Sequence, residues 1–294
     1  MEGRILKIGT RGSALAVAQT GTVAACLTVP TEIITITTKG DVNQAPIPLD
    51  TIGKAWFTEE IEQALLAQRI DFAIHSLKDL PPELPEGLAI VPVLPRADAR
   101  DVLVSKVFGQ TLATLPQGAV IGTDSIRRKA LLLAERPDLV VQSIRGNIDT
   151  RLRKLKEEGY DAIVIAAAGL ARLDRTDVIA EYFDPTVFVP AAGQGVLAAE
   201  YRTEDAGIAS LLQNLIDPDT MSVVWTEQAF SDAVGGGCKL PVGCYARIAE
   251  GQVYISGMVG EMDATHVRRG QKEGPVAEGP ALARALAQEL MSDA

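Results

Sequence analysis

Ile8-Gly9-Thr10-Arg11-Gly12-Ser13 is the stretch that most constrains the fold. The apolar residues before it predict a buried strand over 5–9, and Ser13 is a suitable N-cap for a helix running towards Leu27. A strand that passes through a glycine turn into a helix is typical of open α/β folds. These folds bind ligands at such junctions because a helix N-terminus presents free N–H groups and a positive dipole end.

A second junction of this kind lies near the middle of the chain. Ile121-Gly122-Thr123-Asp124-Ser125 repeats the order of strand, glycine turn and serine, and Arg127 and Arg128 follow directly. An echo this short also arises by chance, so it does not establish a duplication. It does place an arginine-bearing helix start in each half of the chain. A ligand could then lie in a cleft between the two halves.

The remaining pattern alternates strands and helices up to Pro218. Strands are expected over 32–38, 72–76, 140–144 and 162–166, and helices over 58–68 and 148–158. After Pro218 the pattern predicts a helix to Ala233, strands around 245–248 and 253–258, and a last helix starting near Pro280. The expected fold class is two α/β domains followed by a smaller C-terminal α+β domain.

Proline-containing segments at 95–100, 190–194 and 217–218 are the expected crossings between domains. They predict a first domain made of residues 1–95 and 196–216, a second domain of 101–190, and a C-terminal domain of 218–294. A chain of 294 residues is long enough for two or three cores of ordinary size.

Positive charge is concentrated at the strand–helix junctions, although the chain as a whole is acidic. The formal net charge is -10, from 38 acidic and 28 basic residues. The basic residues that fall in these short Gly/Ser/Thr-bearing segments are Arg11, Lys54, Lys78, Arg127, Arg128, Arg145, Arg151 and Arg172. Guanidinium groups match carboxylates bidentately, so the pattern indicates a ligand with several carboxylates or phosphates. The alternative is that each of them is a solvated surface charge.

Several classes of function are disfavoured by composition. An acidic balance with 4% aromatic residues argues against nucleic-acid binding, and the absence of an apolar run of 18 residues argues against a membrane span. The first residues do not resemble a secretion signal. Three cysteines without a CxxC motif, Cys26, Cys238 and Cys244, fit a reducing cytoplasm. His75 and His266 are the only histidines, so no metal site is expected.

Beyond these patterns, the chain resembles the porphobilinogen deaminase (hydroxymethylbilane synthase) family over nearly its whole length. Many short segments carry the resemblance, and they occur in the family's order. They are Ile8-Gly9-Thr10-Arg11 with Ser13, Lys39-Gly40-Asp41, Asp71 to Pro81, Gly122-Thr123 with Ser125-Ile126-Arg127-Arg128, Ile144-Arg145-Gly146-Asn147, Thr150-Arg151-Leu152, Gly169-Leu170 with Arg172-Leu173, Pro190 to Gly195, and Gly236-Gly237-Cys238 with Pro241-Val242-Gly243.

The resemblance implies three domains, of which the first two are similar to type II periplasmic binding proteins, with the active site in the cleft between them. It implies that four porphobilinogen molecules are joined head to tail, each losing ammonia, to give the linear tetrapyrrole hydroxymethylbilane. Growth would start from a dipyrromethane cofactor held by a thioether at Cys238. A cytoplasmic monomer that binds neither nucleic acid nor membrane is expected.

Roles for individual residues also follow from the resemblance. Asp79 would stabilise the positive charge that develops as porphobilinogen loses ammonia, and it would then accept the proton released on coupling. The residues expected to hold the cofactor, besides Cys238, are Ser76, Lys78, Thr123, Ser125, Arg127, Arg128 and Arg145. Those expected to hold substrate are Arg11, Ser13, Lys54, Arg145, Arg151, Arg172 and Gln194, although Gln194 is better explained as part of a hinge.

Structural alternatives exist for the key residues. Asp79 before Leu-Pro-Pro also suits a plain turn, and Cys238 also suits a small buried apolar site. Cys244 and His75 are expected to be core residues. The segment 50–57, a candidate lid, departs from the family by having Asp50 and Ala55 where a basic residue and a glycine are usual.

Two other functions remain open on the sequence. One is a cytoplasmic anion-binding protein of the same two-domain fold without turnover, and the other is a family member that binds the tetrapyrrole but turns over poorly. A last expectation concerns the state without cofactor. Arg11, Arg127, Arg128 and Arg145 would then face one another with no anion among them, and their repulsion would loosen the protein.

Overall fold

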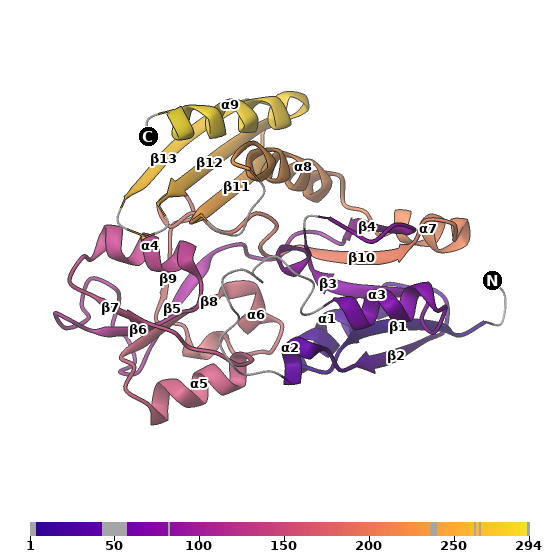
Figure 1. The fold of residues 1–294 in the computed structure, drawn as a ribbon, viewed down its shortest axis with the longest axis horizontal. Coiled ribbons are helices and arrows are strands. Elements are labelled where there is room, and N and C mark those ends of the chain that lie inside the picture. The colour runs from indigo at the N-terminus through magenta and orange to yellow at the C-terminus, as the bar shows by residue number, and fades with distance from the viewer. Residues whose placement is uncertain are drawn as a thin grey trace. The chain divides into compact units, whose positions relative to one another are not determined.

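The computed structural model describes residues 4–42, 58–81, 83–235, 240–261, 263–264 and 266–292 (Figure 1). Lys54, the candidate lid at 50–57 and Cys238 lie outside the described residues. The chain forms two compact units: unit 1 comprises residues 1–97 and 195–221, and unit 2 comprises residues 98–194 and 222–294. The finer division into three domains at the limits given above stays a prediction.

Unit 1 is built on a five-stranded sheet in the order β2-β1-β3-β10-β4. The strands are β1 (Leu6–Arg11), β2 (Thr31–Ile36), β3 (Phe72–Ser76), β4 (Leu88–Val93) and β10 (Leu197–Arg202). The first three are parallel, and β10 runs antiparallel between β3 and β4. A strand from late in the chain therefore completes a sheet that begins at the N-terminus.

The helices of unit 1 are α1 (Ala14–Ala25), the short α2 (Lys39–Val42), α3 (Glu59–Leu66) and α7 (Ala206–Gln213), with a 3-10 turn over Leu77–Asp79. The sheet core gathers Leu6, Ile8, Phe72 and Ile74 with Leu197 and Ala199 of β10. Burial of these apolar side chains supplies the main driving force for closing the unit. Because β10 contributes to this core, the unit is complete only when residues 197–202 have joined.

Unit 2 contains a similar sheet in the order β7-β6-β8-β5-β9. Its strands are β5 (Asp101–Ser105), β6 (Val120–Gly122), β7 (Val140–Gln142), β8 (Ala162–Ala166) and β9 (Glu181–Tyr182). Here β7, β6 and β8 are parallel, while β5 pairs antiparallel with β8 and β9. The helices are α4 (Ile126–Glu135), α5 (Ile148–Glu157) and α6 (Ala167–Ala171), with a 3-10 turn over Thr176–Val178.

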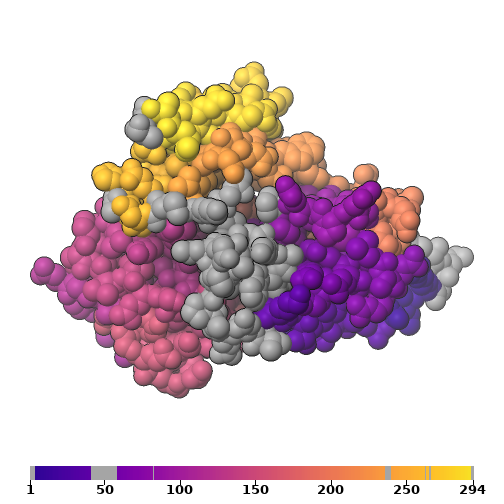
Figure 2. Space-filling model, in the orientation of Figure 1, coloured from indigo at the N-terminus to yellow at the C-terminus, as the bar shows by residue number. Residues whose placement is uncertain are grey.

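The C-terminal part of unit 2 has a sheet and a core of its own. The antiparallel strands β11 (Val242–Ala249), β12 (Gln252–Gly260) and β13 (Val267–Pro275) are followed by a 3-10 turn over Val276–Glu278 and by α9 (Gly279–Ser292). Helix α9 lies along this sheet and forms the surface of this end of the chain (Figures 1 and 2). Its core joins Phe230 of α8 (Pro218–Ala233) with Cys244 and Leu286.

The fold class expected from the sequence is confirmed: two α/β sheets and a separate C-terminal sheet with helices. The limits of β3, β8 and α8 agree with the expected ones. β7 ends at Gln142 rather than at residue 144, and β13 was not expected at all. β13 carries six polar or glycine residues in the run Arg268-Arg269-Gly270-Gln271-Lys272-Glu273, so it lacks the apolar alternation by which strands are recognised.

The two glycines of the echoed sequence are strand residues, which corrects their assignment to a turn. Gly9 lies within β1 and Gly122 ends β6. A Cβ atom at Gly9 would overlap the Ile70 side chain, and one at Gly122 would lie 2.9 Å from Cγ2 of Ile144. Both glycines therefore serve close packing inside their units rather than a special backbone conformation.

Candidate functional site

One pocket in unit 1 collects four of the residues predicted from the sequence. Arg11 ends β1, Ser13 caps α1, Ser76 ends β3 and Asp79 closes the 3-10 turn that follows. β1 and β3 are parallel neighbours, so their carboxyl ends meet at one edge of the sheet. The other residues that line the pocket are Leu15, Ala16, Gln19, Thr58, Ile74 and His75.

Hydrogen bonds fix the walls of this pocket. The Ser13 hydroxyl accepts a bond of 3.3 Å from the backbone N–H of Ala16, which is an N-cap of the predicted kind. Gln19 Nε2 donates to the Ser76 Oγ at 2.9 Å and so ties α1 to the end of β3. The carboxylate of Asp79 is exposed, and Lys78 beside it is half-buried. The pocket thus offers a cationic and an anionic side chain on a rigid frame.

A buried acidic cluster lies directly behind the pocket. His75 Nε2 is 3.0 Å from Oε2 of Glu200, and both side chains are buried. Glu62 of α3 is buried too, and among the described residues neither its Oε1 nor the Oε1 of Glu200 has a hydrogen-bond partner. Burial raises the pKa of Glu62 above its usual value, and the charge of Glu200 adds to the rise, while Thr58 and His75 oppose it. His75 is the core histidine that the sequence predicted.

The corresponding junction of unit 2 runs from β6 into α4. The Ser125 hydroxyl caps α4 by accepting a bond of 3.3 Å from the backbone N–H of Arg128. The Thr123 hydroxyl accepts a bond of 3.2 Å from the backbone N–H of Ser125. Arg127 and Arg128 stand in the first turn of α4, and both side chains are buried. The echoed sequence therefore forms the same local structure twice.

Asp101, the first residue of β5, holds both arginines. Its carboxylate receives Arg127 Nη2 at 2.8 Å and Arg128 Nη2 at 2.7 Å, and the Gln194 amide at 2.9 Å. Arg127 also donates to the backbone carbonyl of Val189 at 2.7 Å. Burial lowers the pKa of Arg127, and the charge of Asp101 opposes that change. One carboxylate faces two guanidinium groups, so this buried cluster carries surplus positive charge.

This cluster corrects the expectation that the arginines would lack an anion when no cofactor is bound. For Arg127 and Arg128 that expectation is wrong, because Asp101 is their internal counter-ion. Sequence reasoning missed Asp101, as it missed Gln19, Glu62 and Glu200. The available signal was an acidic residue at the start of an otherwise apolar strand, Asp101-Val102-Leu103-Val104. Such an acid is rarely buried without a partner.

The other predicted residues of unit 2 lie before and within α5, directly after α6, and beside Asp101. Arg145 Nε is 2.8 Å from Oδ2 of Asp124, and Arg151 Nε donates to the backbone carbonyl of Gly146 at 2.8 Å. Arg172 directly follows α6 and is half-buried, and burial lowers its pKa. Gln194 is fully buried, and its Nε2 also donates to the carbonyl of Ala99 at 2.6 Å. This placement supports a structural role for Gln194 beside Asp101.

Two family models together match nearly the whole chain. Residues 6–210 match the porphobilinogen deaminase dipyrromethane cofactor-binding domain, and residues 221–292 match the porphobilinogen deaminase C-terminal domain. The chain belongs to the porphobilinogen deaminase family. The porphobilinogen deaminase of Deinococcus radiodurans is 46% identical over 98% of this chain and 96% of its own length. That of Roseiflexus castenholzii is 45% identical over 97% of this chain and 95% of its own.

Solved structures similar to this chain include periplasmic proteins. A periplasmic binding protein of Salmonella typhimurium is 12% identical with a TM-score of 0.41, over 75% of this chain and 97% of that one. An ancestral amino acid-binding protein, a precursor of cyclohexadienyl dehydratase, is 14% identical with a TM-score of 0.41, over 72% of this chain and 87% of that one. In the described part of the chain, no helix has the length and apolar character needed to cross a membrane.

Proposed function

We propose that this chain is a hydroxymethylbilane synthase, which condenses four porphobilinogen molecules head to tail with loss of ammonia and releases the linear tetrapyrrole. The observation that carries the proposal is the 46% identity to a porphobilinogen deaminase over 98% of the chain. The pocket of unit 1 agrees with it, since Asp79 and Arg11 line the same cavity. A protein that only bound anions would have no use for an exposed carboxylate there.

Porphobilinogen carries an acetate, a propionate and an aminomethyl group on a pyrrole ring. In this proposal the guanidinium of Arg11 binds a carboxylate of the substrate, since the fork of N–H donors fits that group. The Asp79 carboxylate stabilises the positive charge that develops on the pyrrole as ammonia leaves. It then takes the proton that the attacked pyrrole carbon releases on coupling. Ser13 and Ser76 supply hydroxyl groups at the wall of the pocket.

The donor set of unit 2 fits a dipyrromethane group with its four carboxylates. Two buried guanidinium groups share a single carboxylate there, so further negative charge is favourable. Arg127, Arg128 and Arg145 would hold the carboxylates of the group, with Ser125 and Thr123 as hydroxyl partners. When bound, the group supplies the terminal pyrrole carbon to which the first substrate is joined. Lys78 is proposed as a further residue that holds the group.

Cys238 is proposed to hold this group through a thioether, although it lies outside the described residues. The three glycines before it, at 235–237, remove side chains from its approach to a ligand. Arg151, Arg172 and Lys54 are proposed to bind the substrate and the growing chain, while Gln194 acts through Asp101. A cytoplasmic monomer remains the predicted state.

An intact-mass measurement of the purified protein tests this assignment. The protein should exceed its sequence mass by two linked pyrrole units, and Cys238→Ser should remove the whole increment and the turnover of porphobilinogen. Cys26→Ser, at an exposed position, is the matched control and should keep both. An unmodified mass in a protein that makes hydroxymethylbilane would refute the attachment. A loaded protein that does not turn over would refute the activity.

A further inference from the structure

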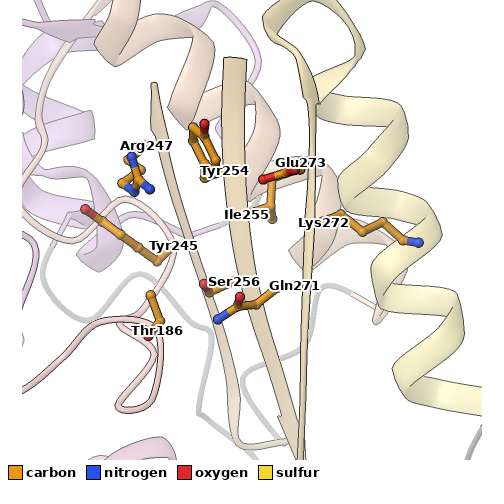
Figure 3. A pocket seen from close by; sticks show the side chains of 9 residues that line it. All are labelled: Thr186, Tyr245, Arg247, Tyr254, Ile255, Ser256, Gln271, Lys272 and Glu273. Atoms are coloured by element: carbon orange, nitrogen blue, oxygen red, sulfur yellow. The ribbon is translucent and has the colours of Figure 1, made fainter. Parts of the chain in front are cut away.

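One face of the C-terminal sheet of unit 2 packs on its helices, and the other packs in part against the α/β core of unit 2, which includes Met258. Cys244 and Ile255 point into the core that this sheet forms with its helices. Side chains alternate along a strand, so their neighbours Tyr245 and Ser256 point to the opposite face. A pocket on that face is lined by Tyr245, Arg247, Tyr254, Ser256, Gln271 and Glu273, and Thr186 adds to its wall (Figure 3). The pocket of unit 1 described above shares no lining residue with this pocket of unit 2.

Strand register arranges these side chains in two rows across the sheet. Arg247 pairs with Tyr254, which pairs with Glu273, so one row carries a cation, an aromatic ring and an anion in that order. The second row is Tyr245, Ser256 and Gln271, which are neutral and can hydrogen-bond. Figure 3 shows the two rows side by side, with Lys272 turned away towards α9.

Arg247 of β11 differs from the basic residues Arg269 and Lys272 of β13. Arg269 is 2.7 Å from a carboxylate oxygen of Glu135, and Lys272 is 2.7 Å from one of Glu289. In contrast, the Arg247 guanidinium lies 4.0 Å from the centre of the Tyr254 ring and has no acidic partner among the described residues. Stacking on the ring fixes the guanidinium plane and leaves its N–H edges available to a ligand.

Glu273 stands at the other end of the same row. Neighbouring strands are about 4.8 Å apart, so the backbones of Arg247 and Glu273 are separated by roughly 10 Å, with Tyr254 between them. Glu273 is exposed and makes no ion pair with any described residue. The two opposite charges are thus held apart across an aromatic ring instead of neutralising each other.

Ser256 supplies the pocket with an available hydroxyl group. Its side chain belongs to a residue that is only 5% exposed, and its hydroxyl has no hydrogen-bond partner in the described part of the chain. The hydroxyl oxygen is itself accessible rather than sealed in the core, and the residue lines the pocket, so the hydroxyl can bond to a ligand. A polar group of a bound molecule would satisfy it.

We propose that this pocket binds a small zwitterion, a molecule with a carboxylate at one end and a primary ammonium at the other. Arg247 holds the carboxylate, Glu273 holds the ammonium, and Ser256 and Gln271 bond to polar atoms between them. The body of the molecule lies along the row, against the exposed edge of Tyr254. The proposal does not depend on the activity proposed above, because it concerns other residues in another unit.

Titration of the full-length purified protein with three matched probes tests the charge requirement. The probes are 6-aminohexanoate, hexanoate and hexylamine, and the readout is the change in backbone amide resonances during the titration. We expect the zwitterion to bind at least about 10-fold more tightly than either single-charge probe, since a second charged contact of about 1.4 kcal/mol gives that factor. The shifted resonances should centre on 245–256 and 271–273.

Two charge-neutral variants locate the contacts. Arg247→Gln should lower the affinity for 6-aminohexanoate to that for hexylamine, and Glu273→Gln should lower it to that for hexanoate. Arg269→Gln, on the same sheet but paired with Glu135, is the matched control and should leave the affinity unchanged. The proposal is overturned if no probe shifts these resonances, if hexanoate binds as well as the zwitterion, or if either pocket variant binds like the native protein. The melting temperature of each variant verifies that it is folded.

Discussion

Unit 1 buries carboxylates beside its strand–helix junction, whereas unit 2 buries guanidinium groups beside the corresponding one. In unit 1, the only basic side chain among the groups that influence Glu62 is His75, which contacts Glu200. In unit 2, Arg127 and Arg128 share one carboxylate. The two junctions have similar sequences and similar serine caps, but the charge placed behind them has the opposite sign.

The two charged environments suit different parts of the proposed reaction. The charge of Glu200, which raises the pKa of Glu62, also favours positive charge in the unit 1 pocket, and positive charge develops on porphobilinogen as ammonia leaves. Surplus base in unit 2 favours the carboxylates of a tetrapyrrole chain. Burial within the acidic cluster disfavours the ionised form of Glu62, and its pKa is raised for that reason. In unit 2, the charge of Asp101 opposes the effect of burial on the pKa of Arg127.

Removing the counter-ion of unit 2 should have the largest effect. Asp101→Asn keeps the size of the side chain but leaves two buried guanidinium groups without a negative charge. Breaking a buried ion pair from one side costs about 3–5 kcal/mol, so the free energy of unfolding in urea should fall by that amount. Asp98→Asn is the matched control, because Asp98 pairs with Arg100 at a partly exposed site and should cost at most about 1 kcal/mol. Equal losses of unfolding free energy in the two variants would show that the charge of Asp101 contributes no more than that of a partly exposed ion pair.

Neutralising Asp79 should have the next largest effect, and it should act on turnover rather than on folding. Asp79→Asn removes the charge at an exposed site, so the melting temperature should stay within a degree or two of the native value. Turnover of porphobilinogen should fall by about 10²-fold or more, since one lost electrostatic contact to a developing charge has that effect. Glu83→Gln, also exposed, should leave turnover intact. Near-normal turnover in Asp79→Asn would make Asp79 a turn residue.

Asp79 and Asp101 also differ in whether the sequence predicted them. Local patterns sufficed for β3, β8, α8 and the two serine caps, because the signals lie within a few residues of one another. Four of the predicted site residues do line one pocket, since parallel neighbouring strands bring their carboxyl ends together. Asp79 was singled out by the resemblance to the family, because its own sequence before Leu-Pro-Pro also suits a plain turn.

The buried partners of the site residues could not be predicted from the sequence, because they come from far along the chain. Asp101 meets Arg128 across 27 residues, and His75 meets Glu200 across 125. β10, which carries Glu200, enters the sheet between two strands that lie more than a hundred residues earlier. A single sequence shows that an acid sits in an apolar strand, but the partner depends on which strands become neighbours. β13 escaped notice for a related reason, since its strand character comes from pairing with β12.

The serine caps provide a smaller and symmetrical test. Ser13→Ala and Ser125→Ala each remove one hydroxyl that accepts from a backbone N–H, so each should cost about 1 kcal/mol of unfolding free energy. Ser13→Gly and Ser125→Gly should each cost only a few tenths of a kcal/mol, because glycine is tolerated at an N-cap. If Ser125→Ala costs several times more than Ser13→Ala, the cap of α4 also orders the arginines that follow it, and the two junctions are not equivalent.

Glu62→Gln should produce the smallest effect, and it appears only as a change with pH. The folded-state pKa of Glu62 is raised above the unfolded value of about 4.3, mainly by burial, so the native state disfavours its ionised form. Below the unfolded pKa both states are protonated and nothing is lost. As the pH rises through the raised pKa, the native protein loses stability that glutamine, which cannot ionise, retains. The melting temperature of Glu62→Gln relative to the native protein should therefore increase between pH 4 and pH 8. A flat difference for Glu62→Gln would mean that the pKa of Glu62 is the same in the folded and unfolded states, and the contrast in charge between the two units would then lose its energetic basis.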